Sequence, residues 1–386
     1  MKILFLVTGS HVTLYATASL MTAAQSAGHE VLLATNEPLM EAAEAIGVPT
    51  VSVLQETIRH FVTEGPENTP PPPPDSPQEL RATGRSLARM ARAELDTLRE
   101  LAGAWPPDLV VGTSMSYAAG LLAARLEVPF VRHAEYLAIP VAGIDEGAED
   151  GLRGELKELG LGGLPRPERY LDVCPPSLRA PAGREVRPMR FVPRNPQRRL
   201  APWMYSRPTG RPRVLVTSGT HFRMLPDDSV RYLVEQLALE GAEVVIAAPE
   251  EAAASLGAHL DHVRVGWVPL DVVAPTCDLA VTHAGATTAM TVMAAGVPQL
   301  LMPPNTHTRL ISRALTDHGA ARTVTPDTGP GREPGEVVAA GCREILATPG
   351  YAERARALAE EVAGLPSPAD VVRELNTLRL NAPARG

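Results

Sequence analysis

The stretch Leu279–Pro304 reads LAVTHAGATTAMTVMAAGVPQLLMPP, and it decides the fold. Two apolar runs, Leu279–Thr282 and Gln299–Met302, are short enough to predict buried strands. Between them, Ala289–Ala295 predicts a helix, and the small residues of His283–Thr288 predict the tight turn that precedes it. The stretch is therefore a strand–helix–strand unit, which is typical of a parallel sheet covered by helices.

The turn before this helix is suited to binding phosphate. The first turn of a helix has unpaired backbone N–H groups at the positive end of the helix dipole, and both features favour an anion. His283 can add one more donor, and Thr287 and Thr288 can add hydroxyl groups. An ordinary strand-to-helix turn with threonine caps explains the same residues, so the turn alone leaves both interpretations open.

A second turn of the same kind occurs earlier in this half of the chain. Ser218, Gly219 and Thr220 follow the predicted strand Arg213–Thr217, so they should open at the same edge of the sheet. Two phosphate-compatible turns at one edge suggest a diphosphate. Trp267, after a further short strand, offers a flat face on which a base could stack, although simple packing would also account for it.

The first half of the chain begins on the same plan. A strand at Lys2–Val7 and a helix at Val12–Ala27 are joined by Gly9, Ser10 and His11. The turn has no G-x-G-x-x-G, and the chain has no G-x-x-x-x-G-K-[ST], which disfavours a nicotinamide enzyme and excludes a P-loop. An imidazole at this helix start could act as a base, because the helix dipole should lower its pKa. A cap or a surface histidine is the alternative.

The length of 386 residues predicts two domains. We expect an α/β fold in which each domain is a doubly wound parallel sheet. The stretch from Pro181 to Pro212 is rich in Pro and Arg and is the candidate linker. The expected division is an N-terminal domain at 1–200 with a mobile, proline-rich loop at 60–78, a linker at 201–212, a C-terminal domain at 213–366, and a last helix at 367–386 that returns to the N-terminal domain.

Composition narrows the class of partner. A net charge of −8, with no basic stripe, argues against nucleic acid or an anionic membrane as the main partner. The three cysteines lie far apart, so neither zinc nor a disulfide framework is predicted. The apolar start is too short for a signal peptide and no run is long enough to span a membrane, so we expect a cytoplasmic protein. A homodimer remains open.

Several longer strings resemble one known family closely and cover nearly the whole chain. They are similar to GT-B glycosyltransferases of family one, in the branch that decorates bacterial aromatic polyketides. The GT-B fold consists of two Rossmann-like domains that face a central cleft. The strings are Pro107-Asp-Leu-Val-Val-Gly, Asp172-Val-Cys-Pro-Pro-Ser-Leu-Arg, Pro202-Trp-Met-Tyr, Val214-Leu-Val-Thr-Ser-Gly, Val265-Gly-Trp-Val-Pro-Leu-Asp-Val-Val-Ala-Pro-Thr-Cys-Asp and Gly296-Val-Pro-Gln-Leu-Leu.

The resemblance implies inverting transfer of a deoxysugar from a dTDP-sugar, a substrate rather than a cofactor, to a hydroxyl of an aromatic polyketide, without a metal. It implies that His11 is the general base and that Glu135 is a second catalytic group. The acceptor would be bound by Ser10, His60, Phe61, Met115 and Tyr136. The donor would be bound by Ser218, Gly219, Thr220, Trp267, Val268, His283, Gly285, Ala286, Thr287, Thr288, His307 and Thr308.

The chain also departs from the family pattern. Thr287 stands where Gly is commoner, and His307 and Thr308 replace an Asp-Gln pair that usually holds sugar hydroxyls, which suits a deoxysugar. The acid that usually orients the base would fall near Thr113 or Ser114, so the sequence leaves the partner acid of His11 open.

One C-glycosylating member of this branch, which this chain resembles closely, lacks a histidine at the position of His11 and is thought to use an Asp that aligns with Tyr136, next to Glu135. This chain has the histidine and lacks the Asp, which favours O-transfer. C-transfer to an aromatic carbon, a non-catalytic helper that binds nucleotide or aglycone, and a nucleotide-sugar epimerase remain alternatives.

Overall fold

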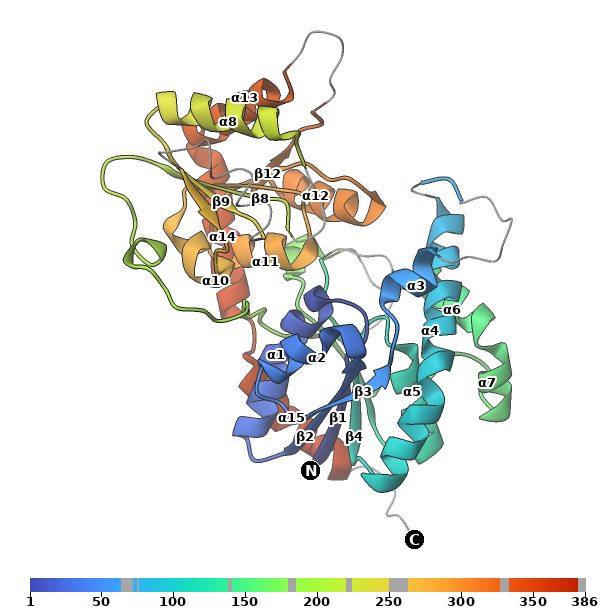
Figure 1. Cartoon of the computed structure of the whole chain (residues 1–386). Helices are drawn as coiled ribbons and strands as arrows, with labels where there is room; N and C mark the ends of the chain where they lie inside the picture. Colours follow the sequence, from blue (N-terminus) through green and yellow to red (C-terminus); the bar gives the residue numbers. More distant parts are fainter. Residues whose placement is uncertain are drawn as a thin grey trace.

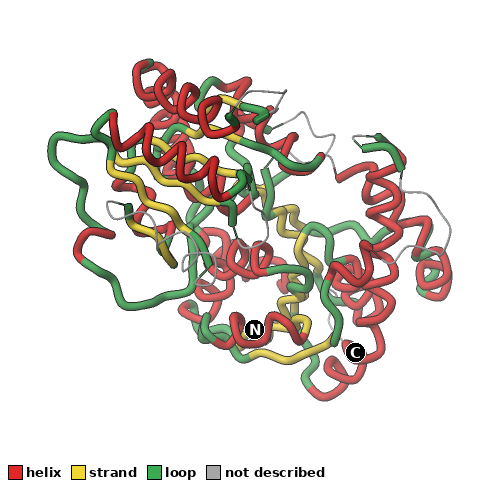
Figure 2. The backbone as a smooth tube through the Cα atoms, turned by 45° about the horizontal axis from the view of Figure 1, so that its top comes forward, coloured by secondary structure: helices red, strands yellow, loops and turns green. Residues whose placement is uncertain are grey.

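The molecule contains two parallel β-sheets, each covered by helices on both faces (Figure 1). The structure is a computed structural model that describes residues 1–63, 72–74, 76–137, 141–179, 185–219, 224–249, 263–326 and 333–380. Figure 2 shows the two sheets as separate groups of strands with helices around them. This confirms the α/β class and the two doubly wound sheets expected from the sequence.

The first sheet has seven parallel strands, and the first strand in sequence lies near its centre. Apolar runs such as Ile3–Val7 are completely buried because helices cover both faces of the sheet. In spatial order the strands are β3 (Thr50–Leu54), β2 (Glu30–Asn36), β1 (Lys2–Leu6), β4 (Leu109–Thr113), β5 (Phe130–Ala134), β6 (Arg169–Asp172) and β7 (Arg187–Pro188).

The helices of this half divide between the two faces. Leu14 and Met21 belong to the core on one face, and Leu87 and Leu98 belong to the core on the other. Except for α4, which follows α3, and α7, which follows α6, each helix listed here comes after a strand, so its N-terminus lies towards the carboxyl edge of the sheet. The helices are α1 (His11–Ser26), α2 (Met40–Glu44), α3 (Ile58–Thr63), α4 (Pro77–Ala104), α5 (Tyr117–Leu126), α6 (Val141–Gly151) and α7 (Arg153–Glu158).

The second sheet has six parallel strands on the same plan. Its strands, in spatial order, are β10 (Arg264–Gly266), β9 (Glu243–Ala247), β8 (Arg213–Thr217), β11 (Leu279–Thr282), β12 (Gln299–Leu301) and β13 (Ala321–Thr323). Its helices are α8 (Asp227–Leu239), α10 (Leu270–Val273), α11 (Ala286–Ala294), α12 (Thr306–His318), α13 (Pro334–Ala347) and α14 (Pro349–Gly364). None of the helices that the structure describes is long and apolar enough to cross a membrane.

The last helix, α15 (Pro368–Leu380), packs against the first half of the chain. Val371 and Leu375 share a buried cluster with Leu14 of α1, and the two helices lie side by side in Figure 1. Glu374 forms an ion pair with Arg187 of β7. The cluster also includes Met290 of α11, so apolar packing is continuous between the two halves.

Two segments differ from the sequence-based expectation. The proline-rich loop expected at 60–78 is shorter, because α3 extends to Thr63 and α4 begins at Pro77; residues 64–71 and 75 lie outside the described part. The first part of the stretch considered as linker, Pro181–Pro212, belongs to the N-terminal sheet. Arg187 pairs with Leu171 of β6, and Phe191 is buried in the core. Prolines at this sheet edge concealed the strand, since edge strands tolerate them.

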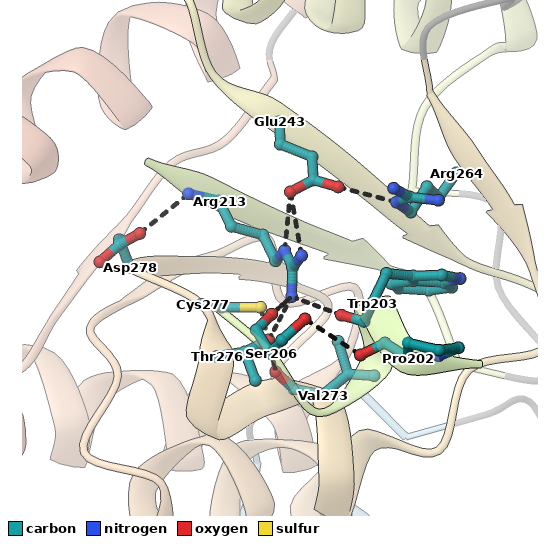
Figure 3. A network of polar contacts seen from close by, with 10 residues as sticks. All are labelled: Pro202, Trp203, Ser206, Arg213, Glu243, Arg264, Val273, Thr276, Cys277 and Asp278. Carbon is teal, nitrogen blue, oxygen red and sulfur yellow. Dashed lines mark hydrogen bonds and ion pairs between the residues drawn. The ribbon is translucent and has the colours of Figure 1, made fainter. Parts of the chain in front are cut away.

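A buried ion-pair network ties the linker to the second sheet (Figure 3). Arg213, at the start of β8, donates to the Glu243 carboxylate at 3.0 and 3.1 Å, and Glu243 also accepts from Arg264 at 2.7 Å. The same guanidinium donates to the backbone carbonyls of Trp203 and Ser206 at 3.0 and 2.9 Å. The linker is therefore attached to the sheet at the edge opposite the candidate site.

Candidate functional site

The predicted site residues that the structure describes lie after the carboxyl ends of strands. On the first sheet, Ser10 and His11 follow β1, His60 and Phe61 follow β3, Met115 follows β4, and Glu135 and Tyr136 follow β5. On the second sheet, Ser218 and Gly219 follow β8, Trp267 and Val268 follow β10, His283 to Thr288 follow β11, and His307 and Thr308 follow β12. Thr220 lies outside the described residues.

The turns after β8 and β11 share one local geometry. The Thr217 hydroxyl accepts from the Gly219 N–H at 3.2 Å, and the Thr282 hydroxyl accepts from the Ala284 N–H at 3.1 Å. Gly219 has φ +69° and Ala284 has φ +60°, so both turns pass through the left-handed region. Ala284 adopts this conformation at a cost of about 1–3 kcal/mol, and such strain is concentrated at ligand sites. Neighbouring strands thus present paired turns at one edge.

His283 fills the space between these two turns. A Cβ added to Gly219 would lie 2.8 Å from Cε1 of the imidazole, and a Cβ added to Gly285 would lie 2.3 Å from Nε2. Burial lowers the pKa of His283, against a backbone hydrogen bond with Thr217 that raises it. The imidazole is therefore neutral at pH 7 and has one N–H to donate.

Replacing Gly285 with alanine is expected to raise the KM for the sugar donor about 10-fold or more. Gly285 has φ −63°, which alanine can also adopt, so backbone strain would not cause the effect. The added Cβ would instead displace the His283 imidazole, and its N–H could then no longer form a hydrogen bond with the diphosphate of the sugar donor. Initial-rate kinetics with varied donor would measure it. Gly350→Ala, where an added Cβ meets nothing within 4 Å, is the control and should leave KM unchanged. An unchanged KM in Gly285→Ala would contradict the role of His283.

Helix α11 begins at Ala286, three residues earlier than predicted. Ala286, Thr287 and Thr288 are therefore its first turn, where backbone N–H groups have no partner within the helix. The sequence concealed this because β-branched threonines are weak helix formers. The Thr287 hydroxyl also donates to the Val12 carbonyl at 3.4 Å, which joins the starts of α11 and α1 across the two halves.

His11 is the first residue of α1 and is exposed. Its imidazole lies 6.4 Å from the ring of Tyr15, one helical turn later. The turn before it is fixed by Asn36, whose side-chain oxygen accepts from the Gly9 N–H at 3.1 Å. Because Val12, the next residue, contacts Thr287, the start of α1 lies against the start of α11.

Glu135 is completely buried just beyond β5. Its Oε2 accepts from the Ser114 N–H at 3.0 Å, and its Oε1 has no hydrogen-bond partner among the described residues. Burial raises the pKa of this carboxyl to about 7, although hydrogen bonds from Ser114 and the charge of Arg132 oppose the increase. The group can therefore exchange a proton near neutral pH.

Tyr136 joins this carboxyl to the second half of the chain. Its ring packs edge to face on His307 of α12, with centroids 5.3 Å apart. Burial lowers the pKa of His307 to about 4, and burial and the neighbouring Glu135 raise the pKa of Tyr136. Both rings are therefore neutral at pH 7.

The other predicted residues have mixed surroundings. Phe61 is buried in the core under α3, which is a packing role, whereas His60 is exposed. Thr308 completes the capping box of α12, whose N-cap is Asn305: its N–H donates to the Asn305 side chain at 3.0 Å and its hydroxyl to the Asn305 carbonyl at 2.9 Å. The Trp267 ring lies 4.9 Å from the Arg198 guanidinium.

Sequence reasoning missed three residues that shape the site: Asn36, Ser114 and Arg198. Little in the sequence indicates these residues. Asn36 and Ser114 contact the site through hydrogen bonds that involve a backbone N–H, and Arg198 is one of several arginines in its segment. Among the residues that the structure describes, no group of three or more His, Cys, Asp or Glu side chains could hold a metal ion.

The chain matches two family models. They are described as the N-terminal and C-terminal domains of erythromycin biosynthesis protein CIII-like proteins, over residues 79–219 and 231–378. It is 34% identical to the L-demethylnoviosyl transferase of Streptomyces niveus, over 92% of each chain. It is also 34% identical to the elloramycin glycosyltransferase ElmGT of Streptomyces olivaceus, over 98% of this chain and 97% of the relative.

Among solved structures, the chain is similar to the Streptomyces sp. SF2575 glycosyltransferase SsfS6 complexed with thymidine diphosphate. The TM-score is 0.85 at 30% identity, over 98% of this chain and 99% of the other.

Proposed function

Because this chain belongs to the GT-B antibiotic glycosyltransferases of family one, of the erythromycin biosynthesis protein CIII-like type, we propose that it transfers a deoxysugar from a dTDP-sugar to an aromatic polyketide. The acceptor group would be a hydroxyl of that polyketide or of a similar natural product. The proposal goes beyond family membership in naming the donor, the acceptor and the residues that act on them.

One observation carries the proposal. The Thr287 hydroxyl, in the first turn of α11, donates to the Val12 carbonyl in the first turn of α1 at 3.4 Å. Two helix starts therefore meet between the two halves, and His11 lies at one of them. The start of α11 would hold the anionic leaving group, and the start of α1 would supply the base. Displacement of a diphosphate needs both groups close together.

On the donor side, Trp267 and Val268 would border the base, and the turns after β8 and β11 would hold the diphosphate. Ser218, Gly219, His283 and the N–H groups of 285–288 are its proposed donors. Charge develops on the diphosphate as the sugar leaves, so preorganised N–H groups act most strongly in the transition state. The SsfS6 complex with thymidine diphosphate supports this class of donor. No metal or cofactor would be needed.

On the acceptor side, His11 would take the proton of the acceptor hydroxyl. The oxygen would form its bond to the anomeric carbon while the bond from that carbon to the diphosphate breaks, and dTDP would leave with the electron pair. Attack from the face opposite the leaving group inverts the anomeric configuration. One carboxyl oxygen of Glu135 has no hydrogen-bond partner among the described residues. It would accept a hydrogen bond from a second hydroxyl of the acceptor polyketide.

The deoxysugar part of the proposal rests on His307 and Thr308. His307 packs on Tyr136, and the Thr308 hydroxyl is engaged with Asn305. Few groups therefore remain there to satisfy sugar hydroxyls, and an unsatisfied hydroxyl in a closed site is costly. A sugar lacking some hydroxyls avoids this cost.

C-glycosyl transfer is the second candidate, and Glu135 is the observation in its favour. A buried carboxyl with a pKa of about 7 can accept the proton lost from an aromatic carbon. The two candidates differ in product, because an O-glycosidic bond is cleaved by acid and a C–C bond is not.

The test is a transfer assay with a panel of dTDP-deoxysugars and aromatic polyketide aglycones, with EDTA present. We expect an O-glycosylated product by mass spectrometry and NMR, an inverted anomeric centre, and weaker use of UDP-sugars. Nucleotide binding without transfer to any aglycone would contradict the proposal in favour of a helper. Conversion of the donor without an acceptor would indicate an epimerase instead.

A further inference from the structure

We propose that Arg132 and Asp145 form a positioning pair that holds the Glu135 carboxylate in place through the backbone of Ser114. The inference rests on the proposed function, since it concerns the acceptor side of the same site. Neither residue was expected from the sequence to take part in the site, and both lie outside the groups that would touch substrate.

The backbone of Ser114 connects Arg132 to Glu135. The Ser114 carbonyl accepts from Nε of Arg132 at 2.8 Å and also from Nη2. The Ser114 N–H donates to Oε2 of Glu135 at 3.0 Å. Ser114 is 1% exposed, and its backbone carbonyl and N–H are bound by Arg132 on β5 and by Glu135 just after β5. A movement of the guanidinium would move the donor that orients the carboxylate.

Asp145 holds the guanidinium in turn. Its carboxylate accepts from Nη1 of Arg132 at 3.1 Å and from Nη2 at 2.6 Å, a two-point contact with fixed direction. The Tyr117 hydroxyl donates to Asp145 at 2.8 Å, and the Arg132 guanidinium lies 5.4 Å from the Tyr117 ring. Arg132 is 8% exposed, so water does not readily replace these contacts.

The geometry gives the pair an electrostatic role as well as a mechanical one. The titratable groups around Glu135 are Arg132, His133, Tyr136 and, on α12, His307, which packs on Tyr136. Burial lowers the pKa of His133 and that of His307 to about 4, and burial raises that of Tyr136, so all three are neutral at pH 7. Of these groups only Arg132 carries a charge, and its positive charge favours the ionised form of Glu135.

The arrangement also separates this pair from the donor site. The contacts of Arg132 run to Ser114 after β4 and to α5, α6 and β6, all in the first half of the chain, whereas the proposed diphosphate turns belong to the second sheet. A change at Arg132 should therefore act on the acceptor side and leave donor binding alone. An unchanged KM for the dTDP-sugar therefore distinguishes an effect on the acceptor side from a general loss of folding.

The experiment compares Arg132→Met and Arg132→Lys with the wild-type enzyme. Lysine keeps the charge but cannot contact both Asp145 and the Ser114 carbonyl with a planar fork. The pH profile of kcat/KM is measured for each, together with the KM for the dTDP-sugar. The titration of Glu135 is followed directly by carboxyl ¹³C NMR of glutamate-labelled protein and assigned with Glu135→Gln. Thermal melting checks that each variant is folded.

In Arg132→Met, we expect the Glu135 titration and the matching limb of the pH profile to move upward by about one pH unit or more. Arg132→Lys should shift both by less, and the donor KM should stay within about twofold in each variant. The matched control is Arg92→Met, which removes an exposed partner of Glu155 and should move neither. If Arg132→Met fails to fold, Arg132→Lys carries the test.

A folded Arg132→Met whose Glu135 titration stays at the wild-type position would overturn the inference. So would an equal shift in Arg92→Met. The NMR titration needs no substrate, so the outcomes remain distinct. If the pKa of Glu135 shifts in Arg132→Met but the wild-type protein transfers no deoxysugar, the positioning pair is supported and the proposed function is rejected. If the wild-type protein transfers the deoxysugar but the pKa of Glu135 does not shift in Arg132→Met, the proposed function is supported and the positioning pair is rejected.

Discussion

Replacing His11 with alanine is expected to lower kcat by about 10²-fold or more. His11 begins α1 beside Val12, whose carbonyl accepts from Thr287 at the start of α11, and the proposed function makes His11 the base that takes the acceptor proton. The proposed function assigns donor binding to other residues, so the KM for the dTDP-sugar should change little. Steady-state kinetics at saturating aglycone, with product detected by mass spectrometry, would measure both quantities.

His29→Ala is the matched control for this change. His29 precedes β2 at the opposite edge of the same sheet, so the same substitution there should leave turnover unchanged. Glu135→Gln completes the comparison. If turnover survives in His11→Ala but is lost in Glu135→Gln, His11 is not the base, and the carboxyl buried after β5 takes that role.

Replacing Arg213 with methionine is expected to lower the free energy of unfolding by about 3–5 kcal/mol. The Arg213 side chain is 2% exposed and its partner Glu243 is 6% exposed, so removing the cation leaves a buried carboxylate whose remaining ion-pair partner among the described residues is Arg264. The carbonyls of Trp203 and Ser206 also lose a donor. Urea denaturation followed by circular dichroism would measure the change.

Arg231→Met is the matched control, because the Arg231 partner Asp228 is 90% exposed and such pairs contribute little. Its unfolding free energy should stay within about 0.5 kcal/mol of wild type. An equal loss in both variants would mean that the burial of Arg213 does not set its contribution.

The sign of the pH dependence follows from Glu243. Burial would raise the pKa of Glu243, but hydrogen bonds from Arg264 and Arg213 overcome this and hold it below its ordinary value. The stabilisation is therefore present above the unfolded-state pKa and is lost as the pH falls through the folded-state value. The difference between wild type and Arg213→Met should shrink in acid below about pH 4.5.

The sequence was most informative where the chain is fully buried. The strands Arg213–Thr217 and Leu279–Thr282 were predicted with the bounds that the structure has. A parallel strand covered on both faces is a continuous apolar run that ends at a turn, and both signals are local. Helix starts were less well predicted, as α11 shows, because a first turn tolerates residues that weaken a helix interior.

The placement of the site residues followed from topology. His11, Glu135 and the turn at His283 each follow a strand of a parallel sheet, and the carboxyl ends of such strands share one edge. The same rule put Ser218 and Gly219 beside His283, which fills the space next to Gly219 in the structure.

Other features of the site needed the tertiary structure. Thr308 is a cap in its local context, and Phe61 is a core residue, although a motif alone suggested ligand contact for both. The connection from Arg132 to Glu135 runs through the backbone N–H and carbonyl of Ser114, which any residue type except proline at position 114 could provide. No pattern of side chains records such a contact.

The sequence by itself determined the two parallel sheets, the edge at which each ligand turn opens, and the family. These depend on apolar periodicity, turn residues and strand order, which are local or topological. Only the tertiary structure decided which groups meet: Thr287 with Val12, Tyr136 with His307, and Arg132 with the Ser114 peptide. The physical reason is that burial and hydrogen bonding depend on what packs nearby, and burial is what raises the pKa of Glu135 to about 7.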